Sequence, residues 1–132
     1  MEISYRTAIL PTAEEIIDLY DRAGLPRPTS DKVRIEKMFD NANLLITAWD
    51  KEKLVGVSRS ITDFSWCCYL ADLAIHPDYQ KHGIGKKLIW MTKEKAGEQS
   101  MVLLLSVPTA MEYYPKAGME RLNNAFIINR DK

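Results

Sequence analysis

Residues 72–88 read DLAIHPDYQKHGIGKKL and are the most informative part of this chain. The apolar run up to Ile75 is typical of a buried strand, Pro77 ends it, and the glycines at positions 83 and 85 open a helix. A helix N-terminus leaves four backbone N–H groups without partners, and the aligned peptide dipoles add positive potential there. Glycine lets the backbone approach a ligand closely, because it has no Cβ atom. With three lysines in and after the turn, this segment predicts a strand followed by a phosphate-binding helix N-terminus.

Two common phosphate-binding motifs do not fit this turn. A dinucleotide fingerprint would need a third glycine where Leu88 stands, and no acidic residue lies about twenty positions further on. A P-loop would need Ser or Thr after Gly85-Lys86, and Lys87 stands there. What remains is the pattern Gln-x-x-Gly-x-Gly at residues 80–85.

The residues on both sides of this segment predict a mixed α/β domain spanning residues 1–132. Short apolar runs of alternating or β-branched residues indicate strands, and capping residues and glycines bound the helices. In chain order we first expect a strand at 3–9, a helix capped by the box Thr12-x-x-Glu15 and ending near Gly24, and a helix capped by Ser30. A hairpin of strands 43–49 and 54–62 and a strand at 66–75 follow. The chain then continues with a helix at 83–95, a strand at 101–106, a short helix at 108–116 and a last strand at 122–128.

The overall composition is that of a globular protein. The chain has 132 residues, of which 46% are hydrophobic and 27% charged. Its 18 basic and 18 acidic residues cancel, so no net charge draws it to nucleic acid or to an anionic membrane. The apolar runs are far shorter than the roughly 20 residues of a membrane span, and the N-terminus lacks the layout of a signal peptide. We therefore expect a cytoplasmic protein that binds neither nucleic acid nor membrane.

The cysteines predict neither a disulfide nor a metal site. Cys67 and Cys68 are neighbours in a strand-like run, where successive side chains point to opposite faces. Two thiols and two histidines at unrelated spacings do not form a metal-binding pattern. We expect small packing residues and no metal cofactor.

The Gln-x-x-Gly-x-Gly pattern closely resembles the acetyl-CoA motif of the GNAT family of N-acetyltransferases. Residues 73–79 are similar to the family's central strand and its exit, and residues 110–119, AMEYYPKAGM, resemble its Ala-x-x-x-Tyr-x-x-x-Gly-Phe signature. Val107 stands where the family often has asparagine, and Met119 replaces the usual phenylalanine. The resemblance implies an acyl-CoA N-acyltransferase fold, with a central, mostly antiparallel sheet flanked by helices. It also implies direct transfer of the acetyl group of acetyl-CoA to an amine in a ternary complex.

The resemblance also implies which residues bind the co-substrate. Gln80 would start the turn, and the backbone amides that bind the pyrophosphate would be those of Lys81, His82, Gly83, Ile84, Gly85 and Lys86. The pantetheine arm would pair, like an added strand, with the backbone of Leu73, Ala74 and Ile75.

Two side chains are candidate catalytic groups. Tyr114 matches the family's tyrosine, which implies that it protonates the departing thiolate; a phenol of pKa about 10 can donate to a thiolate of pKa about 8.5. The alternative is an aromatic packing residue, and Tyr113 is expected to pack or to face the acceptor. Asp72, or a water chain that it orients, is the candidate base, provided that burial raises its pKa. A structural carboxylate or a clamp for the acceptor is the alternative.

Other functions remain open at this point. A non-catalytic module that binds acyl-CoA as a sensor would keep the glycine turn without needing Tyr114. A protein acetyltransferase would act on a lysine or an N-terminus. We expect a small-molecule amine as the acceptor, with a protein amine as the alternative, and the resemblance makes a homodimer one option.

Overall fold

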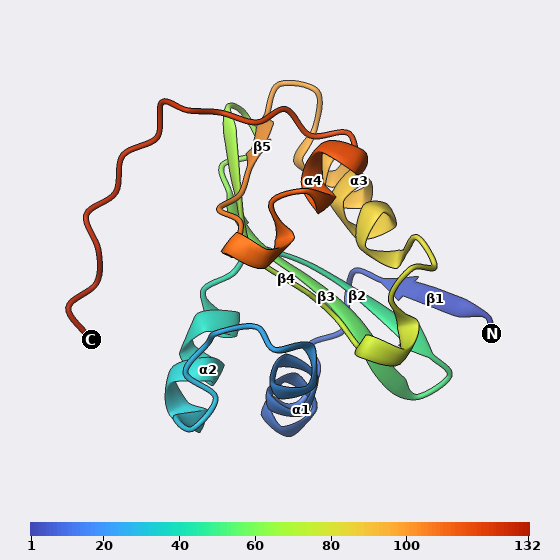
Figure 1. The fold of residues 1–132 in the computed structure, drawn as a ribbon. Helices are drawn as coiled ribbons and strands as arrows, with labels where there is room; N and C mark the ends of the chain where they lie inside the picture. Colours follow the sequence, from blue (N-terminus) through green and yellow to red (C-terminus); the bar gives the residue numbers. More distant parts are fainter.

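A computed structural model describes all 132 residues and shows one five-stranded sheet between two layers of helices (Figure 1). The elements are β1 (Ile3–Arg6), α1 (Ala13–Ala23), α2 (Lys32–Asp40), β2 (Leu44–Asp50), β3 (Lys53–Thr62), β4 (Cys67–Ile75), η1 (Pro77–Tyr79), α3 (Ile84–Ala96), β5 (Met101–Leu103), η2 (Pro108–Ala110) and α4 (Tyr113–Lys116). The strands lie in the order β1-β2-β3-β4-β5, antiparallel except for the β4–β5 pair, which is parallel. The expected mixed α/β fold with a mostly antiparallel sheet is confirmed.

Helix α1 begins and ends as its sequence predicts. The Thr12 side chain accepts from the Glu15 backbone N–H at 3.1 Å, and the Glu15 carboxylate accepts from the Thr12 backbone N–H at 2.9 Å. Gly24 closes the helix with a φ of +71°, a left-handed conformation that glycine adopts without strain. Helix α2 differs from the expectation, because its cap is Asp31 and not Ser30. The Asp31 carboxylate lies three residues before Arg34 and accepts from its backbone N–H at 3.1 Å.

Two apolar cores lie on the two faces of the sheet. Ile16, Leu19 and Ile35 pack between the sheet and the helices α1 and α2, while Ile84 and Leu88 pack between the sheet and α3. All five side chains are at most 2% exposed, and burying a side chain of this size stabilises the fold by about 1.5–3 kcal/mol. Helix α4 lies beside α3, and a hydrogen bond of 2.8 Å from Trp90 Nε1 to the carbonyl of Ala117 links the two.

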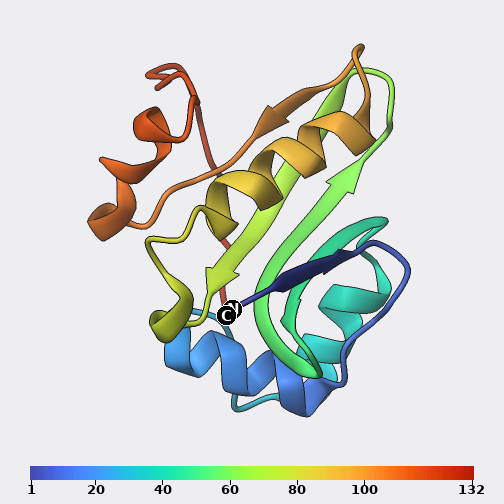
Figure 2. The same cartoon turned by 90° about the vertical axis from the view of Figure 1, so that its right-hand side faces the viewer.

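Several predicted elements are shorter than expected. The first strand ends at Arg6 and not at residue 9, and the helix predicted over 108–116 is divided between η2 and α4. Strand β5 pairs with β4 only through Met101–Leu103, although the strand is predicted to continue to residue 106. The chain leaves β5 early because it bends toward η2 and α4 (Figure 2).

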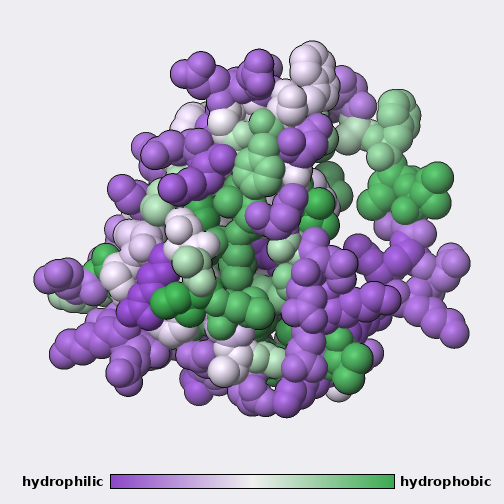
Figure 3. All heavy atoms as spheres, turned by 180° about the vertical axis from the view of Figure 1, so that it is seen from behind, coloured by the Kyte–Doolittle hydropathy of each residue, from purple (hydrophilic) through white to green (hydrophobic).

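The last predicted strand, residues 122–128, is wrong for the single chain. No backbone–backbone hydrogen bond involves residues 120–132, and Phe126 and Ile128 are 99% and 100% exposed. The segment leaves α4 and passes outside the edge of β5, so it has no strand to pair with (Figure 1). Its apolar atoms stand clear of the body at the right of Figure 3.

None of the helices combines the length and the hydropathy that are needed to cross a lipid bilayer.

Candidate active site

A cleft opens where β4 and β5 separate. The two strands are paired only between residues 67–69 and 101–103, so the rest of β4, residues 70–75, has no strand beside it on that edge. The space has a volume of about 710 Å³. Its walls come from β4, the glycine turn, the chain after β5, α4 and the connection after α1. The arrangement leaves backbone groups of β4 available to an extended ligand.

The glycine turn lies at one end of this cleft. Gly83 is the N-cap of α3, has a φ of +79° and provides no side-chain cap, so the first N–H groups of the helix have no side-chain partner. Lys81 also has a positive φ, +67°, which is uncommon for a residue with a side chain. The resulting turn presents backbone N–H groups, with the helix dipole behind them, to the cleft.

The hydroxyl group of Tyr113 occupies part of this turn. It lies against Gly85, the second residue of α3, on the side of the cleft. A Cβ atom at Gly85 would overlap with this hydroxyl, so glycine is required there for the close approach. Burial raises the pKa of Tyr113, and the Lys86 N–H partly offsets this effect. An oxygen acceptor therefore fits the turn, as a phosphate oxygen would. The sequence predicts that Tyr113 packs or faces the acceptor, and the structure places its hydroxyl beside Gly85, in the turn that is predicted to bind the pyrophosphate.

Tyr114 also lines the cleft. Its ring packs edge-to-face against that of Tyr113, with 5.3 Å between the ring centroids. Burial and the neighbouring Tyr113 raise the pKa of the Tyr114 hydroxyl, while Arg27 acts in the opposite direction. The hydroxyl is therefore protonated at neutral pH and can donate a proton. This location is compatible with the predicted acid role, which remains a prediction.

Asp72 lies beneath the cleft and does not face it. Its side chain is 1% exposed and accepts hydrogen bonds from Tyr20 Oη at 2.8 Å, Arg27 Nε at 2.6 Å and Arg59 Nε at 2.6 Å. Burial alone would raise the pKa of Asp72, but the hydrogen bonds and charges of Arg59 and Arg27 outweigh it and lower the pKa. A carboxylate that is already paired in this way is a poor proton acceptor. The geometry supports the structural alternative over the role of base.

The partners of Asp72 were not identified from the sequence. Arg27 joins the connection after α1 to β4, because its Nη2 also donates to the carbonyl of Ala71 at 2.8 Å. It lines the cleft together with Ala23, Gly24 and Leu25. The sequence signal was Pro26-Arg27-Pro28, where two prolines hold an arginine in an extended segment. That signal predicts the extended backbone, but not the carboxylate that the arginine pairs with.

The structure brings most of the predicted site residues together. The cleft is lined by Leu73, Ala74, Ile75, Gln80, Lys81, Gly83, Ile84, Gly85, Lys86 and Tyr114. Gln80 Nε2 also donates to the carbonyl of Ile75 at 3.3 Å, which ties the turn to the end of β4. Two predicted residues do not line the cleft: His82 points to solvent, and Asp72 is buried below it.

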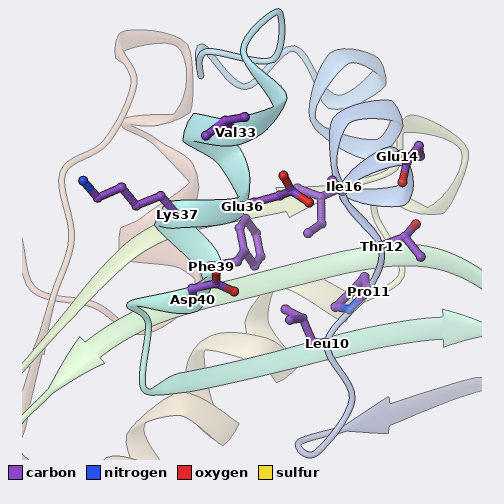
Figure 4. A pocket seen from close by; sticks show the side chains of 11 residues that line it. Leu10, Pro11, Thr12, Glu14, Ile16, Val33, Glu36, Lys37, Phe39 and Asp40 are labelled. Atoms are coloured by element: carbon purple, nitrogen blue, oxygen red, sulfur yellow. The ribbon is translucent and has the colours of Figure 1, made fainter.

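A second hollow lies between α1 and α2 and has a volume of about 620 Å³ (Figure 4). Its floor is formed by Ile16 and Phe39, which belong to the core, and Glu14, Glu36 and Lys37 stand at its rim. It contains no glycine turn and no open strand edge. We therefore place the candidate site in the cleft beside β4. The structure also contains no group of three or more His, Cys, Asp or Glu side chains that could hold a metal ion.

Comparisons with known proteins identify one matching family and several similar proteins. A family model described as acetyltransferase (GNAT) family matches residues 11–119. An uncharacterised N-acetyltransferase, ycf52, of Pyropia yezoensis is 30% identical over 110 residues, which cover 79% of this chain and 62% of that protein. The chain thus spans less than two thirds of the length of this curated relative.

Solved structures share the fold. A probable acetyltransferase from meticillin-resistant Staphylococcus aureus superposes with a TM-score of 0.83 at 23% identity, covering 98% of this chain and all of that one. The aminoglycoside N-acetyltransferase AAC(6')-Iy, solved in complex with CoA, superposes with a TM-score of 0.74 at 12% identity, covering 99% and 96%.

Proposed function

Because the chain belongs to the GNAT family of acetyltransferases, we propose that it transfers the acetyl group of acetyl-CoA to the amine of a small molecule. The observation that carries this proposal is the cleft itself, in which an open strand edge leads to a helix N-terminus without a side-chain cap. A thioester substrate with an amide-rich arm and a diphosphate matches both features.

The residues present fit this substrate. The amides of residues 81–86 would hold the pyrophosphate, and Lys81, Lys86 and Lys116 line the same cleft and add positive charge. Leu73, Ala74 and Ile75 would pair with the pantetheine arm. The Tyr113 hydroxyl oxygen already lies against Gly85 in the turn, which supports this fit, because an anionic oxygen is a stronger acceptor than a phenol.

Tyr114 is the proposed general acid. Its raised pKa keeps the hydroxyl protonated, so that it can donate its proton to the thiolate that leaves when the acetyl group moves to the amine. The bond that breaks joins the carbonyl carbon to sulfur, and the bond that forms joins the same carbon to the amine nitrogen.

Water is the proposed acceptor of the amine's own proton. No Asp, Glu or His lines the cleft, and the three donors around Asp72 hold that carboxylate in its ionised form. A lysine-like ammonium has a pKa near 10.4, so only a small fraction is free amine at neutral pH. We therefore expect kcat/KM to rise with pH up to the pKa of the acceptor.

The charge of the cleft restricts the acceptor. Arg27, Lys81, Lys86 and Lys116 line it, and no acidic side chain balances them. A polycationic acceptor would find no carboxylate in the cleft to pair with its further ammonium groups and would meet the charge of Arg27, whereas a single amine on an uncharged or carboxylate-bearing body needs no such partner. The concave shape and the volume of about 710 Å³ are typical of sites for small molecules.

The test is a thiol-release assay with acetyl-CoA and amines of three kinds: amino acids, uncharged monoamines and polyamines. We expect turnover with one of the first two kinds. Tyr114→Phe should lower kcat by about a hundredfold. Calorimetry should show that the affinity of this variant for CoA stays within about twofold of the native value, a difference below 0.5 kcal/mol. Tyr69→Phe, an exposed tyrosine outside the cleft, is the matched control and should keep the native kcat.

Three results would contradict the proposal in whole or in part. Binding of acetyl-CoA without turnover for any amine would favour the non-catalytic module. The absence of binding altogether would remove the assignment of the glycine turn. Turnover that requires a peptide amine would leave the chemistry intact and change the acceptor to a protein.

A further inference from the structure

The guanidinium group of Arg27 lies in the cleft and is only partly used by the protein. Its Nε donates to Asp72 at 2.6 Å, its Nη1 to the carbonyl of Pro26 at 2.7 Å and its Nη2 to the carbonyl of Ala71 at 2.8 Å. A guanidinium has five N–H groups, so one N–H on each terminal nitrogen has no protein acceptor. The side chain is 24% exposed and lines the cleft. The three contacts fix the orientation of the group, and its two free N–H groups remain available to a ligand.

The same group carries a positive charge that the protein does not balance. Arg27 and Arg59 both pair with Asp72, so two guanidinium charges share one carboxylate. Burial raises the pKa of Tyr20, the third partner of Asp72, well above its ordinary value, so this phenol adds no negative charge. No Asp or Glu lines the cleft, and charges that are withdrawn from water are normally paired. The cluster therefore has one excess positive charge, which favours an anionic group in the ligand.

Of the two arginines, Arg27 is the one that a ligand can reach. The Arg59 side chain is 9% exposed and does not line the cleft, and its Nη1 donates to the carbonyl of Met38 at 3.2 Å. Arg27 belongs to the connection after α1, which forms a wall of the cleft. An anion in the cleft would therefore contact Arg27 and not Arg59.

Arg27 lies away from the glycine turn. Its partner Ala71 precedes Ile75 by four residues, which corresponds to roughly 13 Å along β4 at about 3.3 Å per residue. The turn lies at the Ile75 end, where Gln80 donates to the carbonyl of Ile75. A pyrophosphate in the turn is therefore too far away to pair with Arg27. The anion that pairs with this arginine belongs to another part of the bound ligands.

That part is the reacting end of the cleft. Arg27 and the proposed general acid, Tyr114, both line the cleft, and the charge of Arg27 acts to lower the pKa of the Tyr114 hydroxyl against the effect of burial. Such an effect weakens with distance, so the guanidinium lies in the neighbourhood of this hydroxyl. The thioester end of acetyl-CoA is uncharged and offers no anion there. The acceptor is the remaining source of a negative group.

We infer that Arg27 binds a carboxylate of the acceptor, so that the amine that receives the acetyl group belongs to an amino carboxylate. This inference rests on the proposed function and narrows its acceptor to one chemical class. The two oxygens of a carboxylate match the two free N–H groups in a bidentate contact, one of the strongest hydrogen-bonded pairings in proteins. The contact also balances the excess charge of the cluster. It orients the acceptor, with the carboxylate at Arg27 and the amine toward the thioester.

Pairs of acceptors that differ only in the carboxylate test the inference. A panel of α- and β-amino acids is compared, each with its own carboxamide, in the thiol-release assay. The ratio of kcat/KM within a pair measures the preference for the carboxylate. Arg27→Gln should lower this ratio about tenfold or more, because it removes a bidentate contact with a charged group. The different basicities of the two amines cancel, because the same pair is used for each variant. An unchanged ratio would overturn the inference.

Arg59→Gln is the matched control. Both variants leave Asp72 with one arginine and should lower the thermal midpoint, so a loss of stability does not distinguish them. Only Arg27→Gln should lose the preference for the carboxylate, since Arg59 does not line the cleft. Equal losses in the two variants would show that the whole cluster acts through the fold, and would contradict a direct contact with Arg27. Weaker binding of CoA to Arg27→Gln with an unchanged preference would assign the arginine to the co-substrate, and would also contradict the inference.

A binding measurement separates this inference from the proposed function. The N-acetyl derivatives of the same amino acids and of their carboxamides are titrated into the native chain by calorimetry, with and without CoA. We expect the carboxylate to bind about tenfold more tightly than the amide or better, and Arg27→Gln to bind the two equally. This preference without turnover of any amine would leave the carboxylate site in place and contradict the enzyme assignment. Turnover without a preference in either measurement would support the enzyme and overturn the role of Arg27.

Discussion

The polar groups around Asp72 are paired with other protein groups, whereas those of the glycine turn are not, although both sets lie on or directly after the same strand. Each oxygen of the Asp72 carboxylate has an arginine as a partner at 2.6 Å, and the group is almost inaccessible to water. In the turn, Gly83 offers no side-chain cap and the chain leaves the first N–H groups of α3 facing a cleft. Paired polar groups hold β4 and the connection after α1 in place, and unpaired polar groups in the turn remain for a ligand. The comparison predicts that changes around Asp72 act on stability, whereas changes in the turn act on binding.

The largest effect is expected at Asp72. In Asp72→Asn, Arg59 and Arg27 lose their counterion, and breaking a buried ion pair from one side costs about 3–5 kcal/mol. Urea unfolding measures this loss. Asp18→Asn is the control, because the Asp18–Arg22 pair is exposed and such pairs contribute about 0–1 kcal/mol. If the two variants had the same free energy of unfolding, the conclusion that Asp72 stabilises the fold would be wrong.

Acid should weaken the same region before it affects the turn. The pKa of Asp72 is lowered in the folded chain, so its contribution is complete above the unfolded value near 3.9 and is lost as the pH falls through the lowered folded value. We expect the free energy of unfolding to decrease as the pH falls below about 4. The exposed Asp63, whose pKa is lowered to about 2 by the backbone N–H groups of Ser65, Cys67 and Trp66, adds to this trend. The free energy of unfolding should depend less steeply on pH in Asp72→Asn than in the native chain. An identical slope would contradict the contribution assigned to Asp72.

In the turn, Gly85→Ala should affect binding far more than stability. The new Cβ would enter the space next to the Lys86 N–H, where the Tyr113 hydroxyl now lies, and the pyrophosphate would need the same space. We expect the Kd of CoA to rise about tenfold or more, equivalent to at least 1.4 kcal/mol, by calorimetry. Alanine also favours the helix by about 1 kcal/mol, which limits any loss of stability. The double variant Gly85→Ala/Tyr113→Phe should bind CoA as poorly as Gly85→Ala alone. This result would show that the new Cβ atom, and not a displaced Tyr113 hydroxyl, weakens the binding.

The smallest effect is expected from Tyr113→Phe. Removal of the hydroxyl empties the space beside Gly85 without a change in the backbone, so CoA no longer displaces a polar group there. One such polar contact is worth about 0.5–1.5 kcal/mol, so the affinity for CoA should increase by about two- to tenfold. Weaker binding would show that Tyr113 contacts the ligand and does not compete with it.

The local features of the fold were accessible from the sequence because they depend on neighbours. The Thr12–Glu15 capping box, the Gly24 helix end and the turn at Gly83 each depend on residues within one helical turn. Features that depend on distant residues were not accessible. Asp72 has partners 52, 45 and 13 positions away, so its environment, and hence the direction of its pKa shift, follows only from the assembled sheet. The strand predicted at 122–128 failed for the same reason, because strand propensity does not supply a partner edge.

The intrinsic fluorescence of Trp90 can report on ligand binding at the site. Its indole N–H donates to the carbonyl of Ala117 at the end of α4, and its ring lies against Gly118. Trp49 is buried in the core below α1, and Trp66 lies in an exposed turn, so of the three tryptophans only Trp90 contacts the segment that carries Tyr113 and Tyr114. A ligand that displaces the Tyr113 hydroxyl and with it moves α4 would change the polarity around this indole. The emission of the unlabelled protein should therefore follow the arrival of the ligand in real time.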